Sequence, residues 1–307
     1  MASLLQLFAN GVVLGSIILL ASVGLSLLYG IANFANFAHG EFLTLGAYAA
    51  YVGHVTLGLP FIVAAAFSVV TIAVMSVFVD RLIFLRHRDS TPIVLLIVSI
   101  GVALVMRSII RIIWGNEQLS YGLPLSRGVR IIDPITVNIG GYPLNIGLQL
   151  TRDDMIVVLL AIVFATITHL FLTRTKMGVA MRATADNKSL AKVTGIDTEK
   201  VIMVTWALSG ALAALGGMFL AVNTGVILPR IGFEILLVVF AAVILGGIGS
   251  PYGAMLGAYV IGVAQEMSVI ILEPLGLSVS YRPAVSFLIM IGVLLVQPGG
   301  IMGTRGE

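Results

Sequence analysis

The sequence has 307 residues, of which 59% are hydrophobic and only 10% are charged, and its mean hydropathy is +1.11. About a quarter of the residues of a soluble globular chain are charged, so this composition excludes that class and predicts an all-α polytopic membrane protein, with one transmembrane domain over residues 1–307. The net charge of +3 is too small for a nucleic-acid surface, and the absence of cysteine excludes disulfides, thiolate metal sites and cysteine nucleophiles.

Nine apolar runs predict eight or nine transmembrane segments, because about 20 apolar residues cross the hydrocarbon core. In chain order the runs are 9–29, 37–55, 59–84, 92–114, 155–172, 201–222, 235–245, 252–272 and 284–296. The second run follows a polar break and the seventh is short, so we expect these two to be broken or re-entrant helices. No basic residue precedes Arg81, so the first run is predicted to be a retained span and not a signal peptide.

Polar side chains interrupt the first two runs in the stretch 29–46, YGIANFANFAHGEFLTLG. A charge near the bilayer centre costs on the order of 3 kcal/mol, so Asn33, Asn36, His39 and Glu41 are candidates for a substrate pathway. In one interpretation the asparagines cap helix ends and the other two residues lie at the membrane interface. In the other, a broken helix offers its free backbone groups and amide side chains to a zwitterion. Both interpretations stay open.

Basic residues gather in two connections, at 81–88 and at 174–200, which predicts that both are cytoplasmic. This parity puts the loop 115–154 on the extracytoplasmic side, and it puts the N-terminus there as well if the first two runs both span. Within that loop, the alternating apolar segments 129–132 and 135–137 predict a small hairpin over the mouth of the pore.

Further charged residues fall inside or at the ends of later runs. Arg107 and Arg111 lie one helical turn apart and are predicted to reach the outer membrane interface with their long side chains. Glu234 is also predicted to be interfacial. Glu266, late in the eighth run, either lines a pathway or pairs with another helix, and the sequence favours neither role.

Glycines supply packing information in the second half of the chain. Gly249, Gly253 and Gly257 recur at every fourth residue and are expected to let another helix approach, although Pro251 suggests that the helix begins only there. The segments 42–52 and 254–263 share a Gly-Ala-Tyr triplet, a faint internal repeat. The sequence lacks the pattern GxxxxGK[ST], so any ATP hydrolysis has to take place in another subunit.

The cytoplasmic connection 174–200 carries a short predicted helix. Asp186 or Asn187 can cap a helix over 188–193, and Gly195 can close it. The loop is either a plain solvated linker or a docking element. Its apolar residues favour docking to a partner protein; they are Leu190, Ala191 and Val193.

Three blocks, in the same order, resemble the branched-chain amino acid ABC transporter permeases of the LivH type, and the resemblance covers nearly the whole chain. The blocks are GLSLLYGIANFANFAHGEFLTLGAY, KMGVAMRATADNKSLAKVTGIDTEKV and AAVILGGIGSPYGAMLGA. The resemblance implies a multi-pass protein of the inner (cytoplasmic) membrane, paired with a second homologous permease. It also implies two cytoplasmic ATPase subunits, which use the ATP and magnesium, and an extracytoplasmic solute-binding protein. No cofactor is expected in this chain.

The resemblance also gives the connection 174–200 a role. It implies that Ser189, Leu190, Ala191, Lys192 and Gly195 occupy the coupling loop of importers, whose general pattern is Glu-Ala-Ala-x3-Gly. Here Ser189 stands in place of the glutamate and Leu190 in place of the first alanine. The role of the loop is therefore implied more firmly than the role of any one of its residues.

The leading hypothesis is the permease subunit of an ATP-driven importer that moves branched-chain or other hydrophobic amino acids into the cytoplasm by alternating access. A urea or short-amide importer shares the same blocks and is the alternative within the family. An ion-coupled secondary transporter is a further alternative, but few acidic residues are available for it. An enzyme is disfavoured because no HExxH, paired aspartate or Ser-His arrangement appears, and the four histidines lack metal-ligand spacing; these are His39, His54, His87 and His169.

Overall fold

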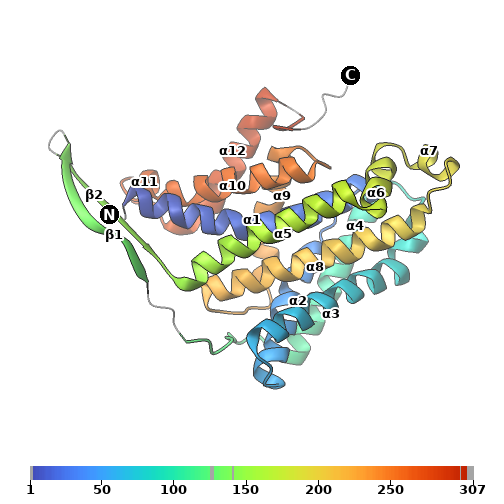
Figure 1. Cartoon of the computed structure of the whole chain (residues 1–307), viewed down its shortest axis with the longest axis horizontal. Helices are drawn as coiled ribbons and strands as arrows, with labels where there is room; N and C mark the ends of the chain where they lie inside the picture. Colours follow the sequence, from blue (N-terminus) through green and yellow to red (C-terminus); the bar gives the residue numbers. More distant parts are fainter. Residues whose placement is uncertain (1–2, 125–127, 140–141, 298, 303–307) are drawn as a thin grey trace.

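Long apolar helices form most of the molecule. The computed structural model of the chain describes residues 3–124, 128–139, 142–297 and 299–302. In that part of the chain, seven helical segments are long and apolar enough to cross a membrane. They are α1 (Leu4–Ala32), α3 (Phe61–Leu82), α4 (Pro92–Trp114), α5 (Arg152–Arg174), α8 (Thr198–Thr224), α10 (Pro251–Met267) with α11 (Val269–Leu272), and the 3-10 turn η3 (Val279–Tyr281) with α12 (Arg282–Val296). Figure 1 shows them packed as one bundle.

Two helices of the bundle are too short to cross a membrane alone, and they are the two for which the sequence predicts a break. The first is α2 (His39–Tyr51), which continues into the short π-helix η1 (Val52–Thr56). The second is α9 (Ile231–Gly246), with 16 residues. The all-α polytopic class with broken helices is therefore confirmed.

The helix α2 begins deep inside the bundle. The ring of its first residue, His39, hydrogen-bonds through Nε2 to the carbonyl oxygen of Ala21, at 3.0 Å. Ala21 lies eleven residues before the end of α1, or about 16 Å along the helix axis. The non-helical connection 33–38 therefore runs back into the bundle from the end of α1. From there, α2 and η1 continue toward the end of the bundle at which α1 began.

The helix α9 also begins inside the bundle, but the chain enters from the opposite end, after α8. Its Gly232 donates its backbone N–H to Thr44 Oγ1 of α2, at 3.1 Å, and Gly217 of α8 packs against Leu43. Gly217 lies seven residues before the end of α8, so α9 starts about two turns back from that end. The two short helices thus meet at their N-terminal turns inside the bundle.

The chain consequently contains an inverted structural repeat. A long helix, a non-helical connection, a half-length helix and another long helix occur as α1–α2–α3 and again, in the opposite direction, as α8–α9–α10. The faint repeat read from the segments 42–52 and 254–263 pairs different elements, because those segments belong to α2 and α10, whereas α2 corresponds in position to α9. The small residues that the two segments share reflect close helix packing in each, and they do not show that α2 and α10 are equivalent elements of the repeat. Such inverted repeats are typical of membrane transporters.

Small residues let the central helices approach closely. Gly11 and Gly15 of α1 pack against α10 around Gly262, and Gly46 of α2 packs against Ala214 of α8. An added side chain would collide with backbone atoms of the other helix at Gly11 and Gly46, and with the Tyr259 ring at Gly15. Between helices in a membrane, dispersion contacts of this kind replace the hydrophobic effect as the source of stability. The central position of α1 and α8, which are the most buried long helices, follows from them.

The two ends of the bundle carry different elements, as Figure 1 shows. A β-hairpin projects from one end, and the helices α6 (Lys176–Asp186) and α7 (Lys188–Val193) lie at the other. The basic connections predicted to share the cytoplasmic side do meet: Arg88, just after the 3-10 turn η2 (Phe84–His87), pairs with Glu199 at the start of α8. The positive-inside rule then makes the end with α7 cytoplasmic.

The hairpin differs from the one predicted. Strand β1 (Val129–Ile139) pairs in antiparallel fashion with β2 (Tyr142–Leu150), with an irregular register between Arg130 and Ile135. The segments 129–132 and 135–137, predicted to face each other, therefore lie in the same strand. The last paired residues are Ile139 and Tyr142, and the glycine pair 140–141 between them in the sequence lies outside the described residues. Two hydrogen bonds between Gln6 and Gln149 fasten β2 to the start of α1.

Candidate functional site

The break between α1 and α2 is built by its two asparagines. Asn33 ends α1 in the left-handed conformation, with φ +57°, and its side chain is exposed. Asn36 is buried, and its Oδ1 accepts the backbone N–H of Ala38 at 3.0 Å, which supports the turn into α2. The Asn36 amide nitrogen has no hydrogen-bond partner within the described part of the chain. The asparagines thus shape the break, and Asn36 retains an unused donor.

His39 fastens three helices together. It is fully buried, with Nε2 bonded to the Ala21 carbonyl of α1 and Nδ1 3.4 Å from the Ser209 hydroxyl of α8. Because a carbonyl oxygen can only accept, Nε2 carries the proton and Nδ1 accepts from the serine. This places His39 inside the bundle, away from the membrane interface that one of the two interpretations gave it.

Glu41 forms a buried ion pair with Arg107. The carboxylate is fully buried, and Arg107 Nε donates to Glu41 Oε1 at 3.0 Å, with a second contact from Nη2. The guanidinium also lies over the ring of Phe233 in α9, 4.2 Å from its centre. The prediction that Arg107 reaches the outer interface is wrong, because a buried carboxylate close by is a better partner than distant headgroups.

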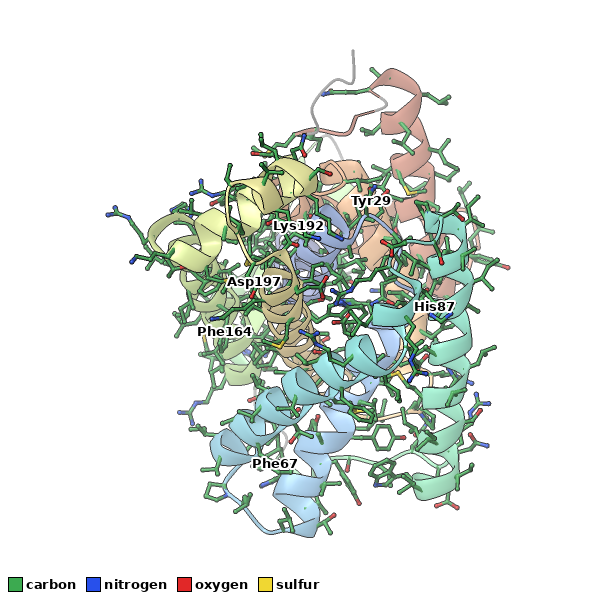
Figure 2. The ribbon with its side chains drawn as sticks, turned by 90° about the vertical axis from the view of Figure 1, so that its right-hand side faces the viewer. Tyr29, Phe67, His87, Phe164, Lys192 and Asp197 are labelled. Carbon is green, nitrogen blue, oxygen red and sulfur yellow. The ribbon has the colours of Figure 1, made fainter. Side chains whose placement is uncertain are left out.

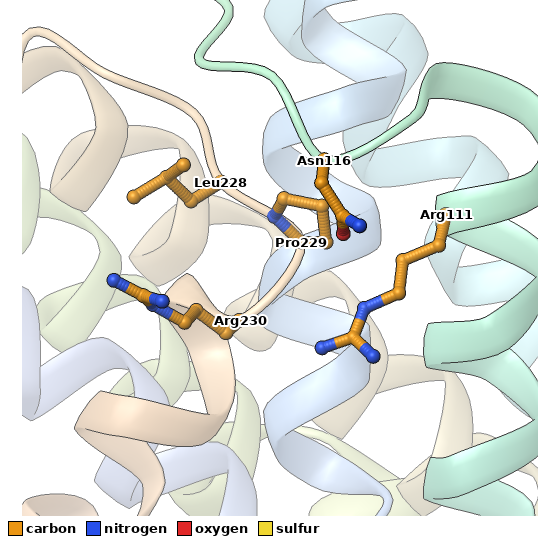
Figure 3. Close-up of a pocket in the computed structure, with 5 residues that line it drawn as sticks. All are labelled: Arg111, Asn116, Leu228, Pro229 and Arg230. Atoms are coloured by element: carbon orange, nitrogen blue, oxygen red, sulfur yellow. The ribbon is translucent and has the colours of Figure 1, made fainter.

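Arg111, one turn further along α4, faces a cavity of about 290 Å³ near the outer end of the bundle. Arg111, Asn116, Leu228, Pro229 and Arg230 line it (Figure 3). In Figure 3 the Arg111 guanidinium and the Asn116 amide point toward the segment 228–230, and the side chain of Arg230 extends away from them. Arg230 instead pairs with Glu234 at 2.6 Å, and both side chains are exposed, as expected for an interfacial Glu234.

Glu266 pairs with Arg282, which joins α10 to the first residue of α12. Its side chain is 13% exposed. Pairing with another helix is one of the two roles predicted for Glu266. The sequence does not predict that the partner is Arg282, because a connection of uncertain length separates the two residues. The structure thus shows Glu266 in the second of the two roles, paired with another helix.

A second network of charges joins the cytoplasmic ends of α3 and α8, and sequence reasoning missed it. Arg88 donates from Nη2 to Asp80 Oδ2 of α3, at 2.7 Å, and pairs through Nη1 with Glu199 of α8. Asp80 is buried and the Arg88 side chain is 12% exposed. In the sequence, Arg88 was only one of several topology-setting basic residues, since nothing in the spacing marks a partner 111 residues away.

The predicted short helix in the cytoplasmic connection is confirmed as α7. Asn187 Oδ1 accepts the backbone N–H of Leu190 at 2.9 Å, and Gly195 follows the helix with φ +89°. Ala191 is buried, whereas Leu190 and Val193 are 60% and 85% exposed. Figure 2 looks onto this end of the bundle and labels Lys192 of α7. Ser189 and Lys192 are exposed as well. The apolar surface that α7 offers to a partner therefore consists of Leu190 and Val193.

Two of the three predicted packing glycines lie between helices. Gly253 packs against Gly246, and Gly257 packs against Ala242, so α10 and α9 touch along this face. Gly249 does not share the face because α10 begins only at Pro251; it has φ +81° and lies beside α1.

The remaining histidines make local hydrogen bonds. His54 and His87 bond to carbonyl oxygens of Leu59 and Ile83, and His169 bonds to the Tyr252 hydroxyl at 2.8 Å. Within the described ranges, no three side chains of His, Asp or Glu gather as metal ligands.

Comparison with known proteins covers nearly the whole chain. Residues 7–294 match the family described as the permease component of the branched-chain amino acid transport system. The chain is 32% identical to the high-affinity branched-chain amino acid transport system permease protein LivH of Escherichia coli strain K12, over 97% of this chain and 95% of that protein. It is 28% identical to the permease protein BraD of Pseudomonas aeruginosa, with the same coverage. It is also 28% identical to a probable LivH of Methanocaldococcus jannaschii, over 97% of this chain and 92% of that protein.

Proposed function

Because the chain belongs to the family of branched-chain amino acid transport permeases, we propose that it is the membrane-spanning subunit of an ATP-binding cassette importer that moves these amino acids into the cytoplasm. The observation that carries the proposal is the identity of 32% over 97% of the chain to LivH of Escherichia coli, a high-affinity permease of the branched-chain amino acid transport system. The seven long apolar helices support a multi-pass position in the membrane, which in a bacterium is the inner membrane.

The proposed complex has further subunits. A second homologous permease completes the membrane path, two cytoplasmic ATPases bind and hydrolyse ATP with magnesium, and an extracytoplasmic protein delivers the amino acid. The exposed Leu190 and Val193 of α7 support docking of an ATPase, because apolar side chains on a short cytoplasmic helix suit a groove in a partner. No cofactor is required in this chain.

Transport then follows from movement of rigid elements. Closure of the ATPases pushes on α7, which is joined directly to α6 and α8. The Asp80–Arg88–Glu199 network carries the displacement from α8 to α3. The two inverted halves rotate against each other about the meeting point of α2 and α9, which opens the path first outward and then inward. Asn33 and Asn36 remain our candidates for contact with the passing substrate, since His39, Glu41 and Glu266 already have partners in the chain.

The partners can be tested by reconstitution. The chain is expressed with the ATPase, permease and binding-protein genes found beside its own, and the ATPase rate of the purified complex is measured in lipid nanodiscs. We expect leucine-loaded binding protein to stimulate hydrolysis, and binding protein mixed with urea or acetamide to leave the rate at its basal level. Stimulation by urea or acetamide instead of leucine would assign the chain to a short-amide importer, and a chain that purifies without any ATPase would contradict the importer.

A further inference from the structure

The cavity beside Arg111 differs from its surroundings in charge. Three arginines lie near it, and two of them are neutralised: Arg107 by Glu41 and Arg230 by Glu234. The Arg111 side chain makes no ion pair or hydrogen bond within the described part of the chain, and its guanidinium faces the cavity (Figure 3). The cavity therefore holds one positive charge without a fixed partner.

The walls of the cavity are held in place by backbone hydrogen bonds. The chain after α4 and the chain before α9 form a short antiparallel bridge, in which Leu119 and Ile227 exchange two bonds of 3.1 and 2.7 Å. Ile227 is completely buried and Pro229 is buried as well. The segment 228–230 is thus fixed opposite Arg111, so the cavity exists before any ligand arrives.

Size and lining restrict what the cavity can hold. Pockets for drug-sized ligands run from about 300 to 1,000 Å³, so a cavity of about 290 Å³ suits a smaller molecule. Arg111 offers a planar guanidinium, which matches a carboxylate with two parallel hydrogen bonds. Asn116 offers an amide that can accept from an ammonium group, and Leu228 and Pro229 offer an apolar surface.

We propose that this cavity is an entry site that receives the amino acid at the extracytoplasmic mouth of the permease, with Arg111 binding its α-carboxylate. The inference rests on the proposed function and deepens it, because it names the group of the substrate that the permease itself recognises. Arg111 lies one helical turn beyond Arg107 on α4, so a zwitterion bound here stands outward of the Glu41–Arg107 pair.

The absence of cysteine allows a direct test of the charge and the ligand. In the complete complex, Leu228→Cys gives this chain a single thiol within the cavity, and its modification by an anionic and by a cationic thiosulfonate reagent is timed. Adding Arg111→Gln should lower the ratio of anionic to cationic rates about 25-fold, because one unit charge about 4 Å away in water changes each rate about fivefold and in opposite directions. Arg152→Gln, which removes an exposed arginine at the start of α5, should leave the ratio unchanged. An unchanged ratio in the Arg111 variant would overturn the proposal.

The same thiol reports on the ligand. Leucine should protect it from modification, and 3-methylbutylamine, which is leucine without the carboxylate, should not. Protection should disappear with Arg111→Gln and return in part with Arg111→Lys. Equal protection by both compounds, or protection that survives Arg111→Gln, would show that the cavity does not recognise a carboxylate.

Transport separates this inference from the function on which it rests. With saturating leucine-loaded binding protein, Arg111→Gln should reduce the maximal uptake about tenfold or more, as expected for the loss of a charge-assisted hydrogen bond, and Arg152→Gln should match the wild type. If the wild type and Arg111→Gln take up leucine equally well, the entry-site proposal is wrong and the importer proposal stands. If the wild-type complex takes up no leucine, the proposed function fails, and the labelling measurements still decide whether the cavity binds a carboxylate.

Discussion

At the scale of single residues, three carboxylates that are shielded from solvent are each paired with an arginine of another segment. Removal of a charge from water is expensive, so a buried ion is stable only beside an opposite charge with good hydrogen-bond geometry. The pairs are Glu41 with Arg107, Asp80 with Arg88 and Glu266 with Arg282. Each pair therefore holds two segments of the bundle together, and the loss of one partner should cost more stability than the loss of both.

The Glu41–Arg107 pair gives the sharpest test of this arrangement. Arg107→Met leaves the fully buried Glu41 carboxylate without a cation, and breaking such a pair destabilises a protein by about 3–5 kcal/mol. The double variant Glu41→Gln with Arg107→Met removes both charges and should recover most of that loss. The measurement is the midpoint of thermal unfolding of the purified chain in detergent.

A matched control for Arg107 is Arg152→Met, which removes an arginine that is exposed at the start of α5. Its midpoint should stay within the error of the wild type, because surface substitutions usually change stability by less than about 0.5 kcal/mol. A double variant that unfolds as easily as Arg107→Met alone would mean that the pair does not act as a unit.

At the scale of elements, the crossing of α2 and α9 depends on a glycine. A side-chain carbon at Gly232 would collide with the backbone carbonyl of Gly40, and neither backbone can move freely at a helix start. Gly232→Ala should therefore destabilise the fold by about 1–3 kcal/mol, as overpacking usually does. The measurement is again thermal unfolding in detergent.

Gly101 in α4 is the control for Gly232, since an added carbon there meets nothing within 4 Å. Gly101→Ala should keep or raise the unfolding midpoint, because alanine favours a helix over glycine by about 1 kcal/mol. If both variants behave alike, the two short helices do not meet as closely as described.

The helix α7 should transmit ATP hydrolysis through its exposed side chains. Leu190→Asp with Val193→Asp places charges where an apolar contact to the ATPase is proposed, so stimulation of ATP hydrolysis by loaded binding protein should be lost. The unfolding midpoint should not change, because both side chains are exposed. Ala191→Asp is the contrasting variant, since it puts a charge at a buried position and should lower the midpoint. Retained stimulation in the double variant would remove α7 from the interface.

The elements differ in how well the sequence predicts them. The long helices, the two broken ones and α7 follow from local signals: apolar length, a polar break, an asparagine cap and a closing glycine. The hairpin is predicted too early in the sequence, because the segment 129–137 alternates throughout and the glycine pair 140–141 comes only after it. The sequence does not predict the buried position of Arg107, because its partner Glu41 lies 66 residues away. It does not predict the cavity either, because residues 111–116 and 228–230 meet only in the folded chain.

At the scale of the whole molecule, two inverted halves meet around α2 and α9. At the cytoplasmic end, the Asp80–Arg88–Glu199 network joins α3 of one half to α8 of the other. If Arg88 carries motion from α8 to α3, Arg88→Ala should lower leucine uptake per ATP hydrolysed while basal hydrolysis continues. Arg86→Ala, two residues away and exposed, is the control with the same loss of charge. The ratio of uptake to phosphate release in proteoliposomes measures the coupling, and an equal ratio in both variants would show that the network is only structural.

The central claim is that this chain forms the membrane path of an ATP-driven importer of branched-chain amino acids. The most direct measurement is uptake of radiolabelled leucine into proteoliposomes that contain the complete complex, with binding protein on one side, ATP on the other, and ionophores that abolish ion gradients. We predict uptake that requires ATP and that excess isoleucine and valine compete away, whereas urea does not. Uptake that ignores ATP and stops when the ion gradients are dissipated would contradict the account.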